Sequence, residues 1–164
     1  MHQERFNVFK SQDPENEHFD VAFKIKGKTI LANKLLLTSA SEYMNVLLSD
    51  RWTRNGEAVK IDDYCYDDFC QFLCFIYTGY CKLNDENIFQ LTDISECYGI
   101  PLLKEFCDKF LSKMQYSVKR IDKLVKFCQK YSMTKMEAVL KDYICLNFDA
   151  IISTKEFLSY EKSE

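Results

Sequence analysis

The chain has 164 residues, of which 47% are hydrophobic and 15% aromatic, enough for one ordinary hydrophobic core or one core with a small satellite. Its 22 basic and 25 acidic residues give a net charge of -3 and form no blocks, which argues against a nucleic-acid or anionic-membrane surface. No apolar run approaches the roughly 18 to 20 residues that cross a bilayer, and the polar start lacks the apolar stretch of a secretory signal.

Residues 3–11 are a predicted short helix in which Phe6 and Phe9 lie one turn apart. An isolated helix with two aromatic residues has little to bury by itself, so it needs a partner surface in its own chain or in a second copy. The alternative is a frayed terminus. The sequence leaves both interpretations open.

Residues 19–26 alternate between apolar and polar side chains and predict a strand with one buried face. Lys26-Gly27-Lys28 predicts a turn, and residues 28–32 return as a second strand of a hairpin. Residues 58–62 predict a short third strand, and residues 80–83 a brief fourth. We therefore expect a small sheet.

The spacing of apolar residues becomes helical over residues 33–50, where Ser41 is a candidate N-cap for a second helix. Residues 51–57 are polar and predict an exposed loop that contains the only tryptophan, Trp52. Trp is enriched at binding hot spots, but Trp52 can equally fold back over the core. Both interpretations stay open.

The most apolar predicted helix covers residues 67–80. Phe69, Phe72, Leu73 and Ile76 fall on one face of this helix, and Gly79 ends it. Because its flanks are also apolar, we expect the helix to be covered on several sides and to lie at the centre of the fold.

Helices are predicted for the rest of the chain, over residues 84–99, 101–111 and 117–128 and from Thr134 onward. Ser117 is a candidate cap, and Thr134-x-x-Glu137 matches a capping box. A few strands mixed with helices, followed by helices only, indicate an α+β domain with a helical extension.

No enzyme, metal or cofactor site is predicted. The eight cysteines include no C-x-x-C pair, and the only histidines are His2 and His18. Several cysteines fall in predicted helices beside apolar stripes, so we expect reduced, packed thiols in an intracellular protein, cytoplasmic or nuclear. No nucleophile-elbow, P-loop or dinucleotide motif occurs, and the paired carboxylates Asp62-Asp63 and Asp67-Asp68 are typical of a helix start.

Three segments in order carry a resemblance to a known family: FDVAFKIKGKTILANKLLLTSASEYMNVLL, IDDYCYDDFCQFLCFIYTGYCKL and ENIFQLTDISECYGIPLLKEFCDKFL. Together they resemble a BTB/POZ domain. The continuation SVKRIDKLVKFCQKYSMTKMEAVLKDYICLNFDAI, with EFLSY after it, resembles the opening of a BACK domain. The resemblance implies a dimerisation segment over residues 1–18, the α+β BTB/POZ fold over 19–115 and a partial, all-helical BACK domain over 116–164.

The resemblance also implies a homodimer built by exchange of N-terminal elements, which gives the predicted first helix a partner. The dimer interface implied in this way consists of Phe6, Phe9, Phe19, Asp20 and Lys34. Asp20 and Lys34 match an acidic and a basic residue that such domains bury near the dimer groove. Asn33 stands where the family usually has histidine, so no histidine pH switch is expected there.

In members that bind the ubiquitin-ligase scaffold cullin-3, the helix after a Ser-x-Tyr-Phe motif and the loop behind it form the partner surface. The cullin-type surface implied for this chain is Tyr43, Met44, Leu47, Leu48, Trp52, Arg54 and Tyr98. Trp52 can serve as the hydrophobic plug of the loop. Arg54 stands where the family places glutamate, and this charge reversal weakens binding if it faces a like charge.

Two functions therefore stay open. One is an adaptor that homodimerises and recruits the N-terminal region of cullin-3 to an unknown substrate protein, which a segment outside these residues would hold. The other is a homodimerising scaffold, transcriptional or cytoskeletal, that does not bind cullin. We also expect a longer natural protein, because a BACK domain that stops in its third helix leaves Phe157 and Leu158 with few neighbours.

Overall fold

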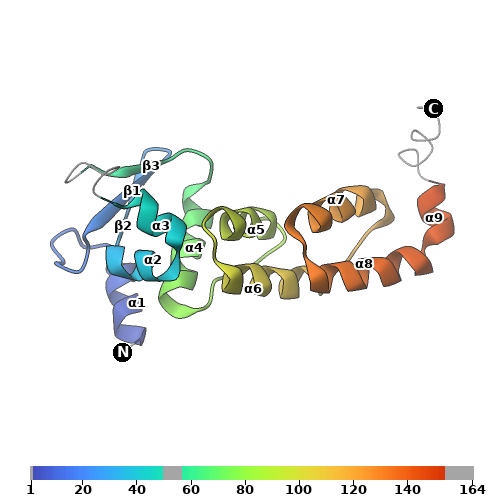
Figure 1. Cartoon of the computed structure of the whole chain (residues 1–164), viewed down its shortest axis with the longest axis horizontal. Coiled ribbons are helices and arrows are strands. Elements are labelled where there is room, and N and C mark those ends of the chain that lie inside the picture. Colours follow the sequence, from blue (N-terminus) through green and yellow to red (C-terminus); the bar gives the residue numbers. More distant parts are fainter. Residues whose placement is uncertain (1, 50–56, 154–164) are drawn as a thin grey trace. The chain divides into compact units, whose positions relative to one another are not determined.

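The structure is a computed structural model that describes residues 2–49 and 57–153 (Figure 1). The chain divides into two compact units, Met1–Lys104 and Glu105–Glu164, which are considered separately below. The predicted loop that contains Trp52 and Arg54 lies outside the described residues, as do Phe157 and Leu158.

The first unit combines a small sheet with a cluster of helices (Figure 1). Its strands are β1 (Val21–Ile25), β2 (Lys28–Ala32) and β3 (Val59–Ile61). Its helices are α1 (His2–Ser11), α2 (Lys34–Ala40), α3 (Glu42–Leu47), α4 (Tyr66–Thr78), α5 (Ile88–Cys97) and the beginning of α6 (Pro101–Leu111). This arrangement confirms the predicted α+β class.

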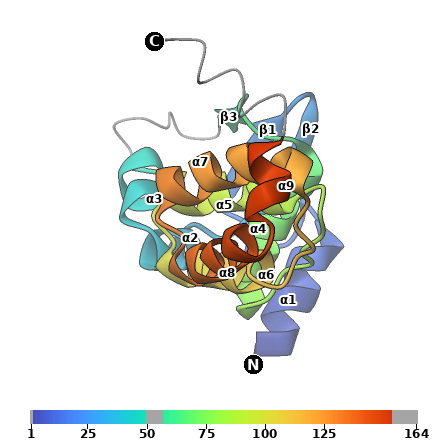
Figure 2. The same cartoon turned by 90° about the vertical axis from the view of Figure 1, so that its right-hand side faces the viewer.

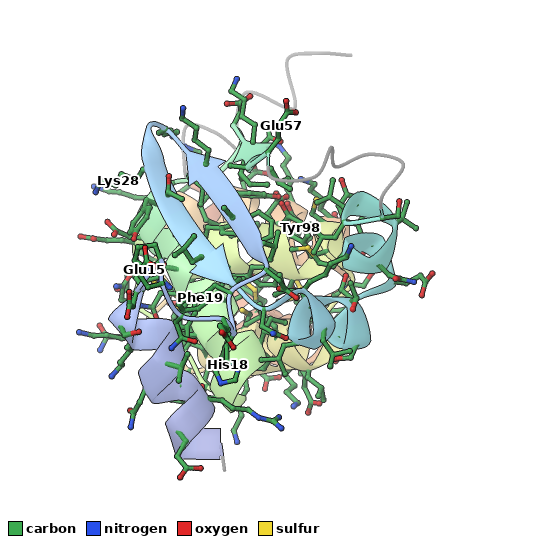
Figure 3. The ribbon with its side chains drawn as sticks, turned by 90° about the vertical axis from the view of Figure 1, so that its left-hand side faces the viewer. Glu15, His18, Phe19, Lys28, Glu57 and Tyr98 are labelled. Carbon is green, nitrogen blue, oxygen red and sulfur yellow. The ribbon has the colours of Figure 1, made fainter. Side chains whose placement is uncertain are left out.

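The sheet has the order β2-β1-β3, with β1 antiparallel to β2 and parallel to β3. Ile25 pairs with Lys28, so only two residues form the turn. Lys26 and Gly27 have φ angles of 46° and 87°, the positive pair of a type I′ turn that suits the twist of a hairpin. The predicted hairpin is confirmed, and Lys28 lies at its tip in Figure 3.

The predicted central helix is confirmed as α4. The Cys65 sulfur accepts the Asp68 N–H at 3.3 Å where the helix begins, and Gly79 ends it with a φ of 72°. Phe69, Phe72 and Leu73 are fully buried. Ile76 is only partly buried, whereas Phe75 and Tyr77 are buried instead. The single-face expectation was therefore too simple, because α1, α2, α5 and β2 contact α4 from several sides.

The predicted N-terminal helix is confirmed as α1, and it packs on its own chain. Phe9 is 2% exposed, and its ring stacks on Tyr77 of α4 with centroids 4.4 Å apart. The side-chain amide of Gln12 pairs with β2: it accepts the Leu31 N–H at 2.8 Å and donates to the Leu31 carbonyl at 3.0 Å. These contacts attach α1 to both the central helix and the outer edge of β2.

The brief strand predicted at residues 80–83 is wrong. Within the described residues this segment pairs with no strand, and nearby side chains satisfy its backbone instead. Thr78 Oγ1 accepts the Tyr80 N–H at 3.1 Å, and Gln71 Oε1 accepts the Lys82 N–H at 2.8 Å. The sequence pattern gave no sign of these side-chain partners.

The second unit is helical. After the end of α6 it contains the 3₁₀ turn η1 (Val118–Arg120) and the helices α7 (Ile121–Tyr131), α8 (Thr134–Leu146) and α9 (Phe148–Ile152). Helices α7 and α8 lie side by side in Figures 1 and 2. Their buried residues include Leu124 and Cys128 on α7 and Met136 and Leu140 on α8, so the predicted helical spacing is confirmed.

Two predicted caps in the second unit are wrong. Ser117 precedes η1 but makes no capping hydrogen bond with its side chain. Thr134 is the first residue of α8 rather than its cap, and the cap position, Met133, has no capping side chain. Asp108 of α6 replaces the expected capping box: its carboxylate accepts the N–H groups of Lys135 and Met136, each at 2.9 Å. A contact between residues so distant in the chain gives no local sequence signal.

Across the two described ranges, no helix combines the length and the apolar character that a membrane span needs.

Candidate functional site

The first candidate surface is the outer face of α3, which Ser41 fixes in place. Ser41 Oγ accepts the Met44 N–H at 3.0 Å, which confirms the predicted cap, and its hydroxyl donates to the Tyr98 carbonyl after α5. Ser41 is itself buried. The start of α3 is therefore attached to the end of α5 by one side chain.

Apolar side chains are exposed on this face of α3. Tyr43 and Val46 are 49% and 54% exposed. The Tyr43 ring meets the buried Tyr98 ring edge to face, with centroids 5.4 Å apart, and Tyr98 stacks on Phe72 of α4 at 5.1 Å. Tyr43 is thus the outer end of an aromatic series that reaches the core, which holds its ring in a defined position.

The second candidate surface is a hollow beside α1, with a volume of about 350 Å³. It is lined by Glu4, Arg5, Val8, His18, Phe19, Asn33, Leu35, Leu36 and Tyr77. Leu35, at its rim on α2, is 73% exposed. Figure 3 shows His18 and Phe19 where the chain passes from α1 into β1. Apolar lining with one acid and one base at the edge suits a protein surface better than a small charged ligand.

Asn33 organises the wall of this hollow. Its Oδ1 accepts the Leu36 N–H at 3.1 Å and caps α2, and its Nδ2 donates to the His18 carbonyl at 3.0 Å. Its backbone N–H donates to the Tyr77 hydroxyl at 2.9 Å. Burial raises the pKa of Tyr77 above its ordinary value, so this hydroxyl stays neutral at physiological pH.

Sequence comparison decides the family. A model of the BTB/POZ domain matches residues 9–115, which is well over half of the chain. The chain belongs to the BTB/POZ family. A BTB/POZ domain is a protein-interaction module, so the exposed face of α3 and the hollow beside α1 are the places to look for partner contacts.

Similar proteins agree with this assignment. BTB and MATH domain-containing protein 36 of Caenorhabditis elegans is 26% identical over 132 residues, which cover 79% of this chain and 41% of that protein. Human Kelch-like protein 24 is 25% identical over 88% of this chain and 24% of its own length. Human Kelch-like protein 22 is 28% identical over 85% and 22%. The chain therefore spans less than half the length of each of these relatives.

Solved structures show the same fold. The BTB domain of zebrafish PATZ1 has a TM-score of 0.58 at 18% identity, covering 69% of this chain and 92% of that domain. The BTB domain of human gigaxonin has a TM-score of 0.53 at 16% identity, covering 66% and 91%. The predicted BTB/POZ fold is confirmed.

The residues predicted for a cullin-type surface divide into two groups in the BTB/POZ domain. Tyr43 is exposed and Leu47 partly exposed, so both are available to a partner. Met44, Leu48 and Tyr98 are buried within the first unit, since α3 packs its inner face against α2 and the end of α5. Any partner contact of these three stays a prediction, and so does the role of Trp52 and Arg54, which lie outside the described residues.

The predicted dimer residues also divide. Phe19 lines the hollow, and Phe6 is partly exposed beside it on α1, whereas Phe9 is buried in its own chain. Asp20 Oδ1 accepts the backbone N–H of Lys34 at 2.5 Å. In this unit Asp20 is exposed and Lys34 partly exposed, so the burial that the family resemblance implied for them is not made by their own chain.

Sequence reasoning missed Val46, although a signal was present. Val46 lies three residues after Tyr43, on the same face of α3, and a helical projection places the two together. The cysteines are all free thiols. Among residues 2–49 and 57–153, no cluster of three or more His, Cys, Asp or Glu side chains is arranged to hold a metal ion.

Proposed function

We propose that the chain is the interaction part of an adaptor that homodimerises and binds the N-terminal region of cullin-3, so that a ubiquitin ligase is brought to a substrate protein. The observation that carries the proposal is the exposed Tyr43–Val46 face of α3. Ser41 and Tyr98 hold this face rigid, which lowers the entropy lost on binding.

The similarity to two Kelch-like proteins over more than four fifths of the chain supports the adaptor over other uses of the domain. As the resemblance implies, η1 to α9 would be the first part of a BACK domain, and the division at residues 18/19 and 115/116 is part of the proposal. The substrate-binding part would lie in a segment outside these residues.

The dimer proposed here uses the hollow beside α1, with a second copy of the chain as its occupant. Leu35, Phe19 and Val8 offer apolar surface, and Glu4 and Arg5 place opposite charges on the same edge. In a two-fold interface each surface faces itself, so an edge that carries both charges can be complementary to its own copy. This is consistent with Phe6 and Phe19 as dimer residues.

Cullin binding is tested by titrating the full chain with the cullin-3 N-terminal domain in a calorimeter. We expect saturable binding, and at least tenfold weaker binding for Val46→Asp, because a charge replaces the centre of an apolar contact. Val139→Asp is the matched control, since Val139 is an exposed valine on α8 and its substitution should leave the affinity unchanged.

An intact dimer that shows no binding at about 100 μM cullin-3 domain would overturn the adaptor proposal and favour the scaffold alternative. Equal losses for Val46→Asp and Val139→Asp would also contradict it, because the loss would then be independent of the α3 face.

Dimerisation is tested by sedimentation equilibrium. Leu35 and Leu102 form a matched pair, because they are 73% and 72% exposed but only Leu35 lines the hollow. We expect Leu35→Asp to weaken the dimer at least tenfold and Leu102→Asp to leave it unchanged. A wild-type chain that remains monomeric at high concentration would contradict the proposed dimer without deciding the cullin test.

A further inference from the structure

Two cysteines on the central helix form a pair. Cys70 and Cys74 lie one turn apart on α4 and are joined by a hydrogen bond between their side chains. Both are partly exposed, whereas Cys81, Cys107 and Cys128 are buried in the core. The pair therefore combines access from solvent with a thiol neighbour that can donate a proton.

The charged and titratable neighbours of the pair come from two helices. The hydrogen bond from Cys74 lowers the pKa of Cys70 to about 7, against the opposing effects of burial and of Asp67 one turn earlier. The same hydrogen bond, with burial and the neighbouring Cys81, raises the pKa of Cys74, and Lys10 of α1 opposes this only in part. At neutral pH one sulfur of the pair is largely thiolate while the other keeps its proton.

We propose that the Cys70–Cys74 pair is a covalent modification site for small soft electrophiles of the α,β-unsaturated carbonyl class, with Cys70 as the nucleophile. The inference is independent of the proposed adaptor function. It rests on the spacing, the S–H···S contact and the partial exposure of the two side chains.

The reaction is an addition that needs no oxidant and releases no leaving group. The Cys70 sulfur attacks the β-carbon of the electrophile and forms a C–S bond, and the electrons of the C=C bond move into an enolate. The enolate α-carbon then takes a proton from the Cys74 thiol or from water. If Cys74 gives the proton, water returns one to it, so one thiol and one alkene become one thioether.

A disulfide is a poorer outcome for this pair while α4 is intact. Side chains one turn apart on a helix have Cβ atoms about 5 to 6 Å apart, whereas a disulfide needs about 3.5 to 4.5 Å. Addition at a single sulfur makes no such demand on the helix backbone.

The size of the effect follows from two opposing factors. At pH 7 a thiol with a pKa of about 7 is half ionised, against about 1% for the ordinary value of 9.0. The lower basicity reduces the nucleophilicity of the thiolate by about six- to tenfold. The net expected gain in rate is therefore about fivefold at neutral pH.

The experiment treats the full chain with substoichiometric N-ethylmaleimide from pH 6 to pH 10 and locates adducts by peptide mass spectrometry. We expect Cys70 to be labelled first among the eight cysteines, with a rate that rises through a midpoint near pH 7. In Cys74→Ala the midpoint should move to pH 9 or above, with about fivefold slower labelling at pH 7.

Cys74→Ser supplies the conservative control, because its hydroxyl still donates a hydrogen bond and should keep most of the wild-type profile. Cys97→Ser, at an exposed thiol, should leave the Cys70 rate unchanged. Circular dichroism verifies that each variant is folded. Preferential labelling of another cysteine, or a Cys70 profile that Cys74→Ala does not move, would overturn the proposal.

Discussion

Asp108 and Met136 are 28 positions apart in the sequence, yet the Asp108 carboxylate accepts the Met136 N–H at 2.9 Å and serves as the N-cap of α8. The same carboxylate accepts the Lys135 N–H at 2.9 Å and the weaker hydroxyl contact of Thr134 at 3.4 Å. A buried acid on α6 thereby satisfies the first N–H groups of another helix and offsets its dipole.

Asp108→Ala should destabilise the second unit by about 2 kcal/mol, since it removes a cap and leaves buried N–H groups without an acceptor. Thr134→Ala should cost less than about 0.5 kcal/mol, because Thr134 is not the cap. Hydrogen exchange of the α8 amides measures both. A larger effect for Thr134→Ala would restore the capping box that the sequence suggested.

Ser41→Ala should loosen α3. The substitution removes the cap of α3 and the link to the Tyr98 carbonyl, and both are buried, so we expect a loss of about 2 kcal/mol. Ser39→Ala, at an exposed serine whose hydroxyl bonds within α2, should change stability by less than about 0.5 kcal/mol. Urea unfolding monitored by tyrosine fluorescence compares the two, and equal losses would refute a special role for Ser41.

Gln12→Ala should free α1 from the edge of β2. The Gln12 amide makes two hydrogen bonds with Leu31 and one with the Phe9 carbonyl, so its loss removes the polar half of the α1 attachment. We expect about tenfold faster hydrogen exchange at the Leu31 amide, consistent with a loss of about 1.4 kcal/mol. Gln90→Ala, at an exposed glutamine on α5, is the control and should leave this amide unchanged.

Phe6 and Phe9 should differ although they lie one turn apart. Phe9→Ala should cost about 3 to 4 kcal/mol, because the ring is buried against Tyr77. Phe6→Ala, at a partly exposed ring, should cost less than about 1.5 kcal/mol but weaken the proposed dimer. Thermal unfolding and sedimentation separate the two effects, and a stable Phe6→Ala variant with an unchanged dimer would remove Phe6 from the interface.

Alkaline pH should destabilise the second unit through Tyr116. Burial raises the pKa of Tyr116 to about 12 in the folded state, while its hydroxyl donates to the Leu111 carbonyl at 2.7 Å. The unfolded chain loses this proton near pH 10, so the contribution is complete below pH 10 and disappears as the pH rises towards 12.

Tyr116→Phe should cost about 1 kcal/mol at pH 8, where the hydrogen bond is lost, and this difference should shrink by pH 11. Urea unfolding at the two pH values measures the change. A difference that grows with pH would contradict the assigned direction of the pKa.

The local chemistry of the chain was enough to predict most elements. Alternation over residues 19–32 predicted the hairpin because strand side chains alternate between two faces, and the Lys26-Gly27 turn tolerates the positive φ angles it needs. The apolar spacing around Phe69 predicted the central helix, and Ser41 its neighbour's cap, because both signals lie within a few residues of the structure that they specify.

Only the tertiary structure decided which side chains of α3 face outward. Tyr43, Met44, Leu47 and Leu48 have similar polarity and helical spacing, yet Met44 and Leu48 are buried and Tyr43 is exposed. Burial depends on where α2 and the end of α5 lie, and the short amphipathic segment carries no information about its neighbours.

The sequence by itself determined the α+β class, the order of the elements and the family, because periodicity, turn residues and helix stops act over a few neighbouring positions. The tertiary structure alone decided the pairing of Gln12 with β2, the Asp108 cap of α8 and the absence of a strand at residues 80–83 within the described chain. Each of these depends on a polar side chain that satisfies the backbone of a neighbouring segment or of one far along the chain. Such partners meet only when the hydrophobic core has brought their elements together.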